Sequence, residues 1–153
     1  MPMTPLVGDG ATALEVIHDA LAAAGYGTPQ QDLFMGLELD GEIDSATGTN
    51  IPDAITVLQE EDGIPTLTMG RPVALENPRI QVIMRGAPGD YLGPKRRAVS
   101  ARYYVAALSN YTARGVTMQT ALPLGSVLPL GKDPAGRHRF SINFTAVTEP
   151  TNA

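Results

Sequence analysis

The sequence predicts an α+β fold in which one mixed, mostly antiparallel sheet is packed by two helices. Apolar residues recur with helical spacing near residues 13–24 and 94–108, and alternate with polar residues in segments between and after them. The order helix, strands, helix, strands is typical of helices packed on one antiparallel sheet. With 153 residues, 43% of them apolar, the chain is long enough for one domain with its own core. We expect this domain to span residues 11–148, between an extended arm at 1–10 and a tail at 149–153.

The first predicted helix runs from Thr12 to about Ala24. Thr12 and Glu15 have the spacing of a capping box, in which each side chain bonds a free backbone amide of the first turn. Gly25 supplies the left-handed residue that commonly ends a helix. Its predicted core face consists of Leu14, Ile17 and Leu21.

Several strands are expected before the second helix. Residues 33–39 alternate, with leucine or methionine at every second position, and predict a half-buried strand; 54–59 and 66–69 are also strand-like. An acidic loop is expected at 40–52, and a turn at 60–63. Strand 79–85 places Ile80, Val82 and Met84 on one side, whereas Ile83 breaks the alternation and predicts that both faces are partly covered.

Pro94 fits the first turn of the second helix. The inner stripe of this helix is predicted to be Ala98, Ala101, Val105 and Leu108, where two alanines favour a close approach to the sheet. Residues 115–121 predict a strand, and 122–136, with three prolines, a long loop or irregular hairpin. Residues 137–147 form the clearest strand pattern, with Phe140, Ile142, Phe144 and Ala146 on one face.

No pattern predicts a catalytic, cofactor or metal site, so we expect a protein that is not an enzyme and has no cofactor. The chain has no cysteine and only two histidines, His18 and His138, about 120 positions apart. His18 is interpreted as a core-edge residue. The glycines near residue 8 lack a preceding strand, and the loop-like segment 125–132 has the wrong spacing for a phosphate loop and is interpreted as a turn.

The acidic loop also lacks the pattern of a calcium site. Asp40, Glu42 and Asp44 have ligand spacing, but Ser45 occupies the glycine position and no final glutamate follows. No stretch approaches the roughly 20 apolar residues of a membrane span, so we expect no membrane contact.

Charge is divided unequally along the chain. Residues 1–76 hold 13 acidic and 1 basic residue, and residues 77–153 hold 3 acidic and 10 basic residues. Unlike patches that attract are useful to a subunit that packs head-to-tail on its own copies. We therefore predict a subunit interface whose acidic side is Asp40, Glu42, Asp44, Glu60, Glu61 and Asp62, and whose basic side is Arg85, Lys95, Arg96, Arg97 and Arg102. Simple solvation, or pairing of these charges within one chain, is the alternative.

Three stretches resemble the tail terminator (tail completion, or minor capsid) proteins of long-tailed bacteriophages. They are Ile51-Pro-Asp-Ala-Ile-Thr-Val, Ile80-Gln-Val-Ile-Met-Arg-Gly, and Pro129-Leu-Gly-Lys-Asp-Pro-Ala-Gly-Arg running into Phe140-Ser-Ile-Asn-Phe. The order and spacing of the three carry the resemblance, mainly over residues 51–147. The family's fold, a small mixed sheet with two helices, agrees with the prediction made from the residues.

The resemblance implies a structural virion protein. Such a subunit forms a ring, usually a hexamer, on the end of the tail tube, where it stops tube growth and provides the head-to-tail joining surface. The implied partners are further copies of the chain, the tail tube protein, a head-completion or neck protein and the tape measure protein, with DNA passing through the lumen without sequence-specific binding. The implied location is the neck of the virion, and the host cytoplasm during assembly. The alternatives are another neck component, such as a head-completion or connector protein, and a small enzyme or nucleotide-binding domain.

Overall fold

The computed structural model describes residues 12–36, 51–61 and 77–150. In chain order, its elements are α1 (Ala13–Ala23), β1 (Leu33–Met35), β2 (Ile55–Glu61), β3 (Arg79–Pro88), α2 (Leu92–Ala106), β4 (Tyr111–Ala113), β5 (Val116–Pro123), β6 (Leu128–Lys132) and β7 (Arg137–Pro150). The predicted α+β class, with one mixed and mostly antiparallel sheet packed by two helices, is confirmed. The predicted arm at 1–10, and most of the tail at 149–153, lie outside the described residues.

The sheet follows the order β1-β2-β3-β7-β5-β4, and β6 also pairs with β7. Every described pairing except β1 with β2 is antiparallel. β3 occupies one edge of β7, while β6 and β5 pair with successive parts of its other edge, from His138 to Ser141 and from Phe144 to Pro150. β7 is therefore the central strand, which agrees with the strong alternation of its sequence.

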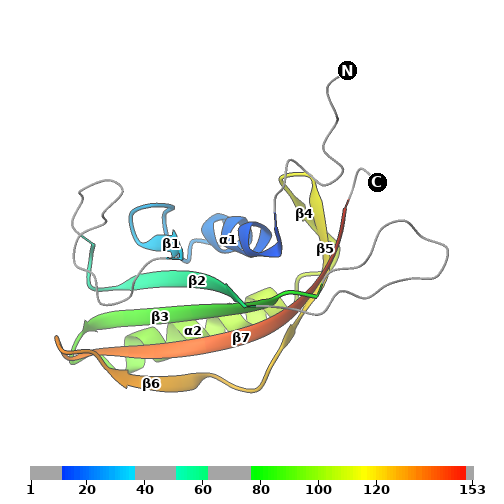
Figure 1. The fold of residues 1–153 in the computed structure, drawn as a ribbon. Coiled ribbons are helices and arrows are strands. Elements are labelled where there is room, and N and C mark those ends of the chain that lie inside the picture. The colour runs from blue at the N-terminus through cyan, green and yellow to red at the C-terminus, as the bar shows by residue number, and fades with distance from the viewer. Residues whose placement is uncertain (1–11, 37–50, 62–76, 151–153) are drawn as a thin grey trace.

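The sheet curls around α1, as Figure 1 shows. This helix contacts β1 and β2 near one end of the sheet and β4 and β5 at the other. α2 lies on the same face and contacts β3, β5 and β7. Both helices thus fill the concave side, and the opposite face of the sheet carries no helix among the described residues.

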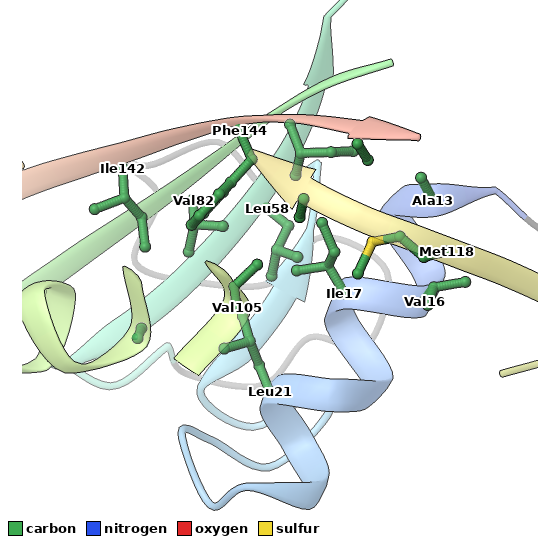
Figure 2. Close-up of a cluster of buried hydrophobic side chains, with 14 of the residues drawn as sticks. Ala13, Val16, Ile17, Leu21, Leu58, Val82, Val105, Met118, Ile142 and Phe144 are labelled. Carbon is green, nitrogen blue, oxygen red and sulfur yellow. The ribbon is translucent and has the colours of Figure 1, made fainter. Parts of the chain in front are cut away.

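The main core lies between the helices and this concave face (Figure 2). Ile17 and Leu21 of α1 are fully buried in it, as predicted, and Leu14 is partly buried beside them. The predicted inner faces of the strands are also confirmed, because the alternate residues are all buried: Ile80, Val82 and Met84 on β3, and Phe140, Ile142, Phe144 and Ala146 on β7.

α2 packs closely on the sheet through small side chains. Ala98, Ala101 and Val105 are fully buried, and Leu108 is partly buried just beyond the end of the helix, as the inner stripe predicted. Pro94 is buried in the first turn next to Gly86, where an added Cβ would lie 2.7 Å from the proline ring. The absence of a side chain at Gly86 therefore lets β3 and the start of α2 approach each other.

A second, smaller cluster covers part of the other sheet face. It consists of Phe34, Ile51, Ile55 and Val57. Val57 is the cross-strand partner of Ile83, which is only 3% exposed. The prediction that both faces of residues 79–85 are covered is therefore confirmed.

The first turn of α1 differs from the prediction. Thr12 is the N-cap with an extended backbone, but its side chain makes no capping hydrogen bond. Instead, the carbonyl of Thr12 accepts from the amides of Glu15 and Val16, and the carboxylate of Glu15 binds Arg114. The capping box was wrong because a distant cation offers this glutamate a stronger partner. The predicted stop at Gly25 agrees with the structure, where this residue has φ +86° and the Tyr26 amide donates to the Leu21 carbonyl.

Two expected segments of the first half are also corrected. On β1, Leu33 and Phe34 are buried and Met35 is 40% exposed, because β1 lies at the sheet edge and turns Phe34 into the second cluster. Residues 37–39 lie outside the described residues. The prediction started the turn at residue 60, which is too early, because β2 continues through Glu61, where it pairs with Arg79.

Two strands, β4 and β6, were missed, whereas β5 matches the strand predicted at 115–121. β4 and β5 form a hairpin through Arg114 and Gly115, both at positive φ, as a tight two-residue turn requires. The segment expected to be a loop or hairpin at 122–136, and interpreted as a turn at 125–132, contains β6. The five residues of β6 are all exposed. The strand thus has no buried face of the kind that alternating apolar residues predict.

Candidate functional site

The acidic side of the predicted interface is only partly described. Asp40, Glu42, Asp44 and Asp62 lie outside the described residues. Glu60 and Glu61 occupy the last two positions of β2, and Glu60 is exposed. Glu60 and Glu61, at the end of β2, are thus the members of the predicted acidic side whose position the structure describes.

Arg85 departs from the prediction. Its side chain is fully buried, and its guanidinium donates from Nε to the carbonyl of Asp53 at 2.8 Å and from Nη2 to that of Pro52 at 2.9 Å. It thus holds the segment before β2 against β3. In the single chain this cation does not reach the surface, and we remove it from the basic set.

Two further predicted cations bind backbone groups of their own chain. Arg97 donates to the carbonyl of Tyr26 at 2.7 Å, and Arg102 donates from Nε and Nη2 to that of Gly125 at 3.0 and 2.8 Å. They brace opposite sides of α2 against the loop after α1 and the link between β5 and β6. Both guanidiniums are thus partly used in holding the fold.

Lys95 and Arg96 remain as exposed cations on the first half of α2. The ammonium of Lys95 lies 5.5 Å from the ring centroid of Tyr91, within the range of a cation–π contact. The Tyr91 ring in turn packs edge-on against His138 and Phe140, each at 5.1 Å between centroids. These two cations are the members of the predicted basic set that the fold leaves most available.

Part of the charge division is neutralised within the chain by Arg114. This residue, at the tip of the β4–β5 hairpin, binds Glu15 at 2.6 Å and Asp19 at 2.8 Å. Burial alone would raise the pKa of Asp19, but hydrogen bonds from Arg114 and His18 outweigh it and lower that pKa. The hydrogen bonds that Arg114 donates to Asp19 and Glu15 raise its own pKa. His18, expected at the core edge, is buried, and its Nδ1 lies 3.1 Å from Asp19.

A second, more buried ion network joins Arg137 to Asp133 and Asp53. Arg137 Nε donates to Asp133 Oδ2 at 2.7 Å, and its Nη1 to Asp53 Oδ1 at 3.1 Å. The amides of Ala135 and Arg137 donate to the other Asp133 oxygen. Burial would raise the pKa of Asp133, but these bonds to Arg137 and Ala135 lower it. Both networks were missed. Arg114 is 95 or more residues from its acids and Arg137 is 84 residues from Asp53, and even the pair of Asp133 and Arg137, four residues apart, lies in a segment expected to be a loop or irregular hairpin.

Large exposed apolar side chains gather in two places. On α2, Leu92, Val99 and Tyr103 follow one another at spacings of seven and four, so they lie on one face, opposite the buried alanines. We name these three residues the α2 stripe. The leucine row consists of Leu122, Leu124, Leu128 and Leu130, on β5, β6 and the link between them. Clusters of this kind, unlike single exposed apolar residues, mark surfaces that another molecule covers.

The leucine row borders the helix-free face of the sheet. Leu122 and Leu128 are the cross-strand partners of Thr145 and Ser141, which alternate with the core-facing residues of β7 and so share the opposite face. Beside the row is an open hollow of about 340 Å³ lined by Arg79, Ile80, Leu124 and Asn143. The α2 stripe and the leucine row therefore belong to different sides of the molecule.

The described residues include no group of three or more histidine, aspartate or glutamate side chains that could hold a metal ion. Within the same ranges, no helix is both long and apolar enough to cross a membrane. The hollow contains one arginine and no nucleophile paired with a base. The surface features that stand out are thus apolar and suited to contact with another protein.

Comparisons with known proteins locate this fold among solved structures. No protein-family model matches the chain, and no curated protein matches it. Among solved structures, the chain is similar to one in the virion of a native gene transfer agent particle, with 16% sequence identity and a TM-score of 0.60. The match covers 91% of this chain and 99% of that one, and it shows that the two share a fold over nearly their whole length.

Proposed function

We propose that the chain is a structural protein of a phage-like virion and, within that class, a tail terminator. In this role it forms a ring on the end of the tail tube, stops tube growth and offers the surface to which the filled head joins. The supporting observation is the likeness in fold to a chain of a gene transfer agent virion, which spans 99% of that chain. The ordered sequence stretches between residues 51 and 147 that resemble tail terminators support the narrower role.

The surface of the molecule is compatible with this role. Its two apolar clusters lie on different sides, and a closed ring of identical copies needs two unlike patches on every copy. The proposed partners are further copies of the chain in a hexamer, the tail tube protein, a neck protein and the tape measure protein. DNA would pass through the lumen without base-specific contacts.

Electron microscopy of assembling tail tubes tests the proposal. Tubes of the cognate tube protein are grown with and without the purified chain, and the expected result is a ring at one tube end together with arrested growth. The Phe144→Asp variant, which places a carboxylate in the core, is the negative control. If tubes grown with an equimolar amount of the chain have bare ends and the same length as tubes grown without it, the tail terminator role is contradicted.

Another neck component is the second candidate, because the similar chain is described only as part of a virion particle, with no position given within it. A head-completion or connector protein predicts binding to the portal and a twelvefold assembly in place of a ring on tubes. Co-sedimentation with purified portal separates the two roles. Binding to the portal without binding to tubes would favour the second candidate.

A further inference from the structure

We propose that a basic strip at one end of the molecule contacts the sugar-phosphate backbone of double-stranded DNA. The strip consists of Lys95, Tyr91, His138 and Lys132, and Arg96 flanks it. This inference rests on the proposed function, because DNA passes through the proposed ring. It identifies the side chains that meet this DNA.

The strip is continuous, although its residues come from two distant parts of the chain. The Lys95 ammonium lies 5.5 Å from the centroid of the Tyr91 ring, and the centroid of this ring lies 5.1 Å from that of His138. Lys132 on β6 is the cross-strand partner of His138 on β7, so their side chains lie next to each other on one face of the sheet. Two ammonium groups are therefore separated by only two rings.

The cations of the strip are not neutralised by an ion pair. Lys95, Arg96 and Lys132 are exposed, and none of them pairs with a carboxylate in the part of the chain that the structure describes. Three positive charges thus reach solvent at this end of the molecule.

Among the described residues, the carboxylate beside the strip is that of Asp90. Its Oδ1 accepts from the Gly93 amide at 2.9 Å, which holds this acid at the start of α2. The ion network of Arg137 belongs to the other face of the sheet, because Arg137 and His138 are successive residues of β7. The cations of the strip therefore outnumber the acid next to them.

Folding alone does not account for the cations on α2. Lys95 and Arg96 lie near the start of the helix, where no acidic residue occupies the first turn and the helix dipole disfavours positive charge. Arg97 beside them binds the carbonyl of Tyr26 and so holds the fold together. Exposed cations kept against the helix dipole are suited to an anion that comes from outside the chain.

The residue types favour phosphate over the carboxylates of an acidic protein. Lysine binds phosphate as a point charge, whereas the guanidinium of arginine matches a carboxylate through two parallel hydrogen bonds. Lysine is also depleted at contacts between proteins. Both ends of the strip are lysines, and Arg97 and Arg102 of the same helix are engaged with backbone carbonyls. A duplex carries a phosphate at every step of both strands, so it can meet both lysines at once.

Fluorescence anisotropy of a short labelled duplex, titrated with the full chain at several salt concentrations, tests the inference. Two to three phosphate contacts per copy predict a salt slope of about −1.8 to −2.7 per copy, and affinity should fall about 12- to 40-fold between about 50 and 200 mM salt. The double variant Lys95→Gln with Lys132→Gln should bind at least about tenfold more weakly at about 50 mM salt, with a slope shallower by about two per copy. Duplexes of unrelated sequence should bind equally, because phosphates carry no sequence information.

Arg79→Gln is the matched control for Lys132→Gln. It removes the same charge from an exposed residue at the start of β3, whereas the strip lies near the end of that strand, where Pro88 pairs with Arg137. We expect a loss below about twofold for Arg79→Gln and above about threefold for Lys132→Gln. Unchanged thermal unfolding of the variants shows that they are folded.

Equal losses for these two single variants, or an unchanged salt slope of the double variant, would overturn the inference, because net charge alone would then decide binding. Poly-glutamate that binds more tightly than the duplex at the same salt would also overturn it and assign the strip to an acidic protein. A wild-type chain that forms rings on tail tubes but does not bind the duplex would overturn the inference and leave the proposed function intact. Binding of the duplex through the strip by a chain that binds neither tubes nor portal would support the strip and overturn the proposed function.

Discussion

Replacing Arg137 by methionine should destabilise the domain strongly. The side chains of Arg137 and Asp133 are 6% and 0% exposed, and Nε of the arginine lies 2.7 Å from Oδ2 of the aspartate. Removing one partner of a buried pair typically costs about 3–5 kcal/mol, because the other charge stays buried without compensation. Here the amides of Ala135 and Arg137 still donate to Oδ1, so we expect the low end, about 3 kcal/mol.

Urea unfolding followed by circular dichroism, at a concentration where the chain is monomeric, measures this change. With a slope of about 2 kcal/mol per molar urea, the midpoint should fall by about 1.5 M at unchanged slope. Asp53→Asn is the matched control, because it removes only the 3.1 Å contact with Arg137 from a carboxylate that is 54% exposed. Its expected cost is below about 1 kcal/mol.

A double-mutant cycle with Asp133→Asn identifies the source of the loss. If the buried charge is responsible, the double variant should lose much less stability than the sum of the two single variants. A loss below about 1 kcal/mol for Arg137→Met, or additive effects in the cycle, would refute the reasoning from burial.

Three further predictions concern the same fold. The pKa of Asp133 is lower in the folded chain than its ordinary value of 3.8, so its contribution to stability is present above that value and should be lost as pH falls through the folded pKa. The free energies of unfolding of the wild-type chain and of Asp133→Asn, measured as a function of pH, should therefore converge at acid pH. Curves that stay parallel would contradict this. Arg114→Gln should cost only about 0.5–1 kcal/mol in urea unfolding, since that ion pair is largely exposed, and a loss above about 2 kcal/mol would disagree. Ala101→Leu should destabilise by about 1–3 kcal/mol through overpacking between α2 and the sheet, whereas Val99→Leu on the exposed side should not; equal thermal shifts would count against close packing there.

The candidate surface could be predicted only in part from the sequence. Lys95 and Arg96 were expected on an interface and are exposed, because the outer face of a helix follows from its period. Arg85 shares their charge yet is buried against the carbonyls of Pro52 and Asp53. Nothing near Arg85 in the sequence indicates that it binds the carbonyl of Asp53, 32 residues away. It was therefore predicted to be exposed, like Lys95 and Arg96.

The leucine row was also invisible in the sequence. Its residues lie in a segment that was expected to be a loop or hairpin because three prolines interrupt it. Leucine recurs at every second position in 122–124 and 128–130, but a proline stands between the two leucines each time. β6 becomes a strand because β7 offers it a free edge beyond the reach of β5. Pairing between distant strands, not local propensity, decides such a segment.

The sequence by itself determined the fold class, the extents of α1, α2 and β7, and the buried faces of these elements. Those features depend on periodicity and on residues such as Gly25 that act over one or two turns. Only the tertiary structure decided which strands pair, how the sheet curls around α1, and which charges meet, as Arg114 meets Asp19 across 95 residues. These arrangements depend on contacts between segments far apart in the chain, and a local pattern carries no information about which distant segment will be its neighbour.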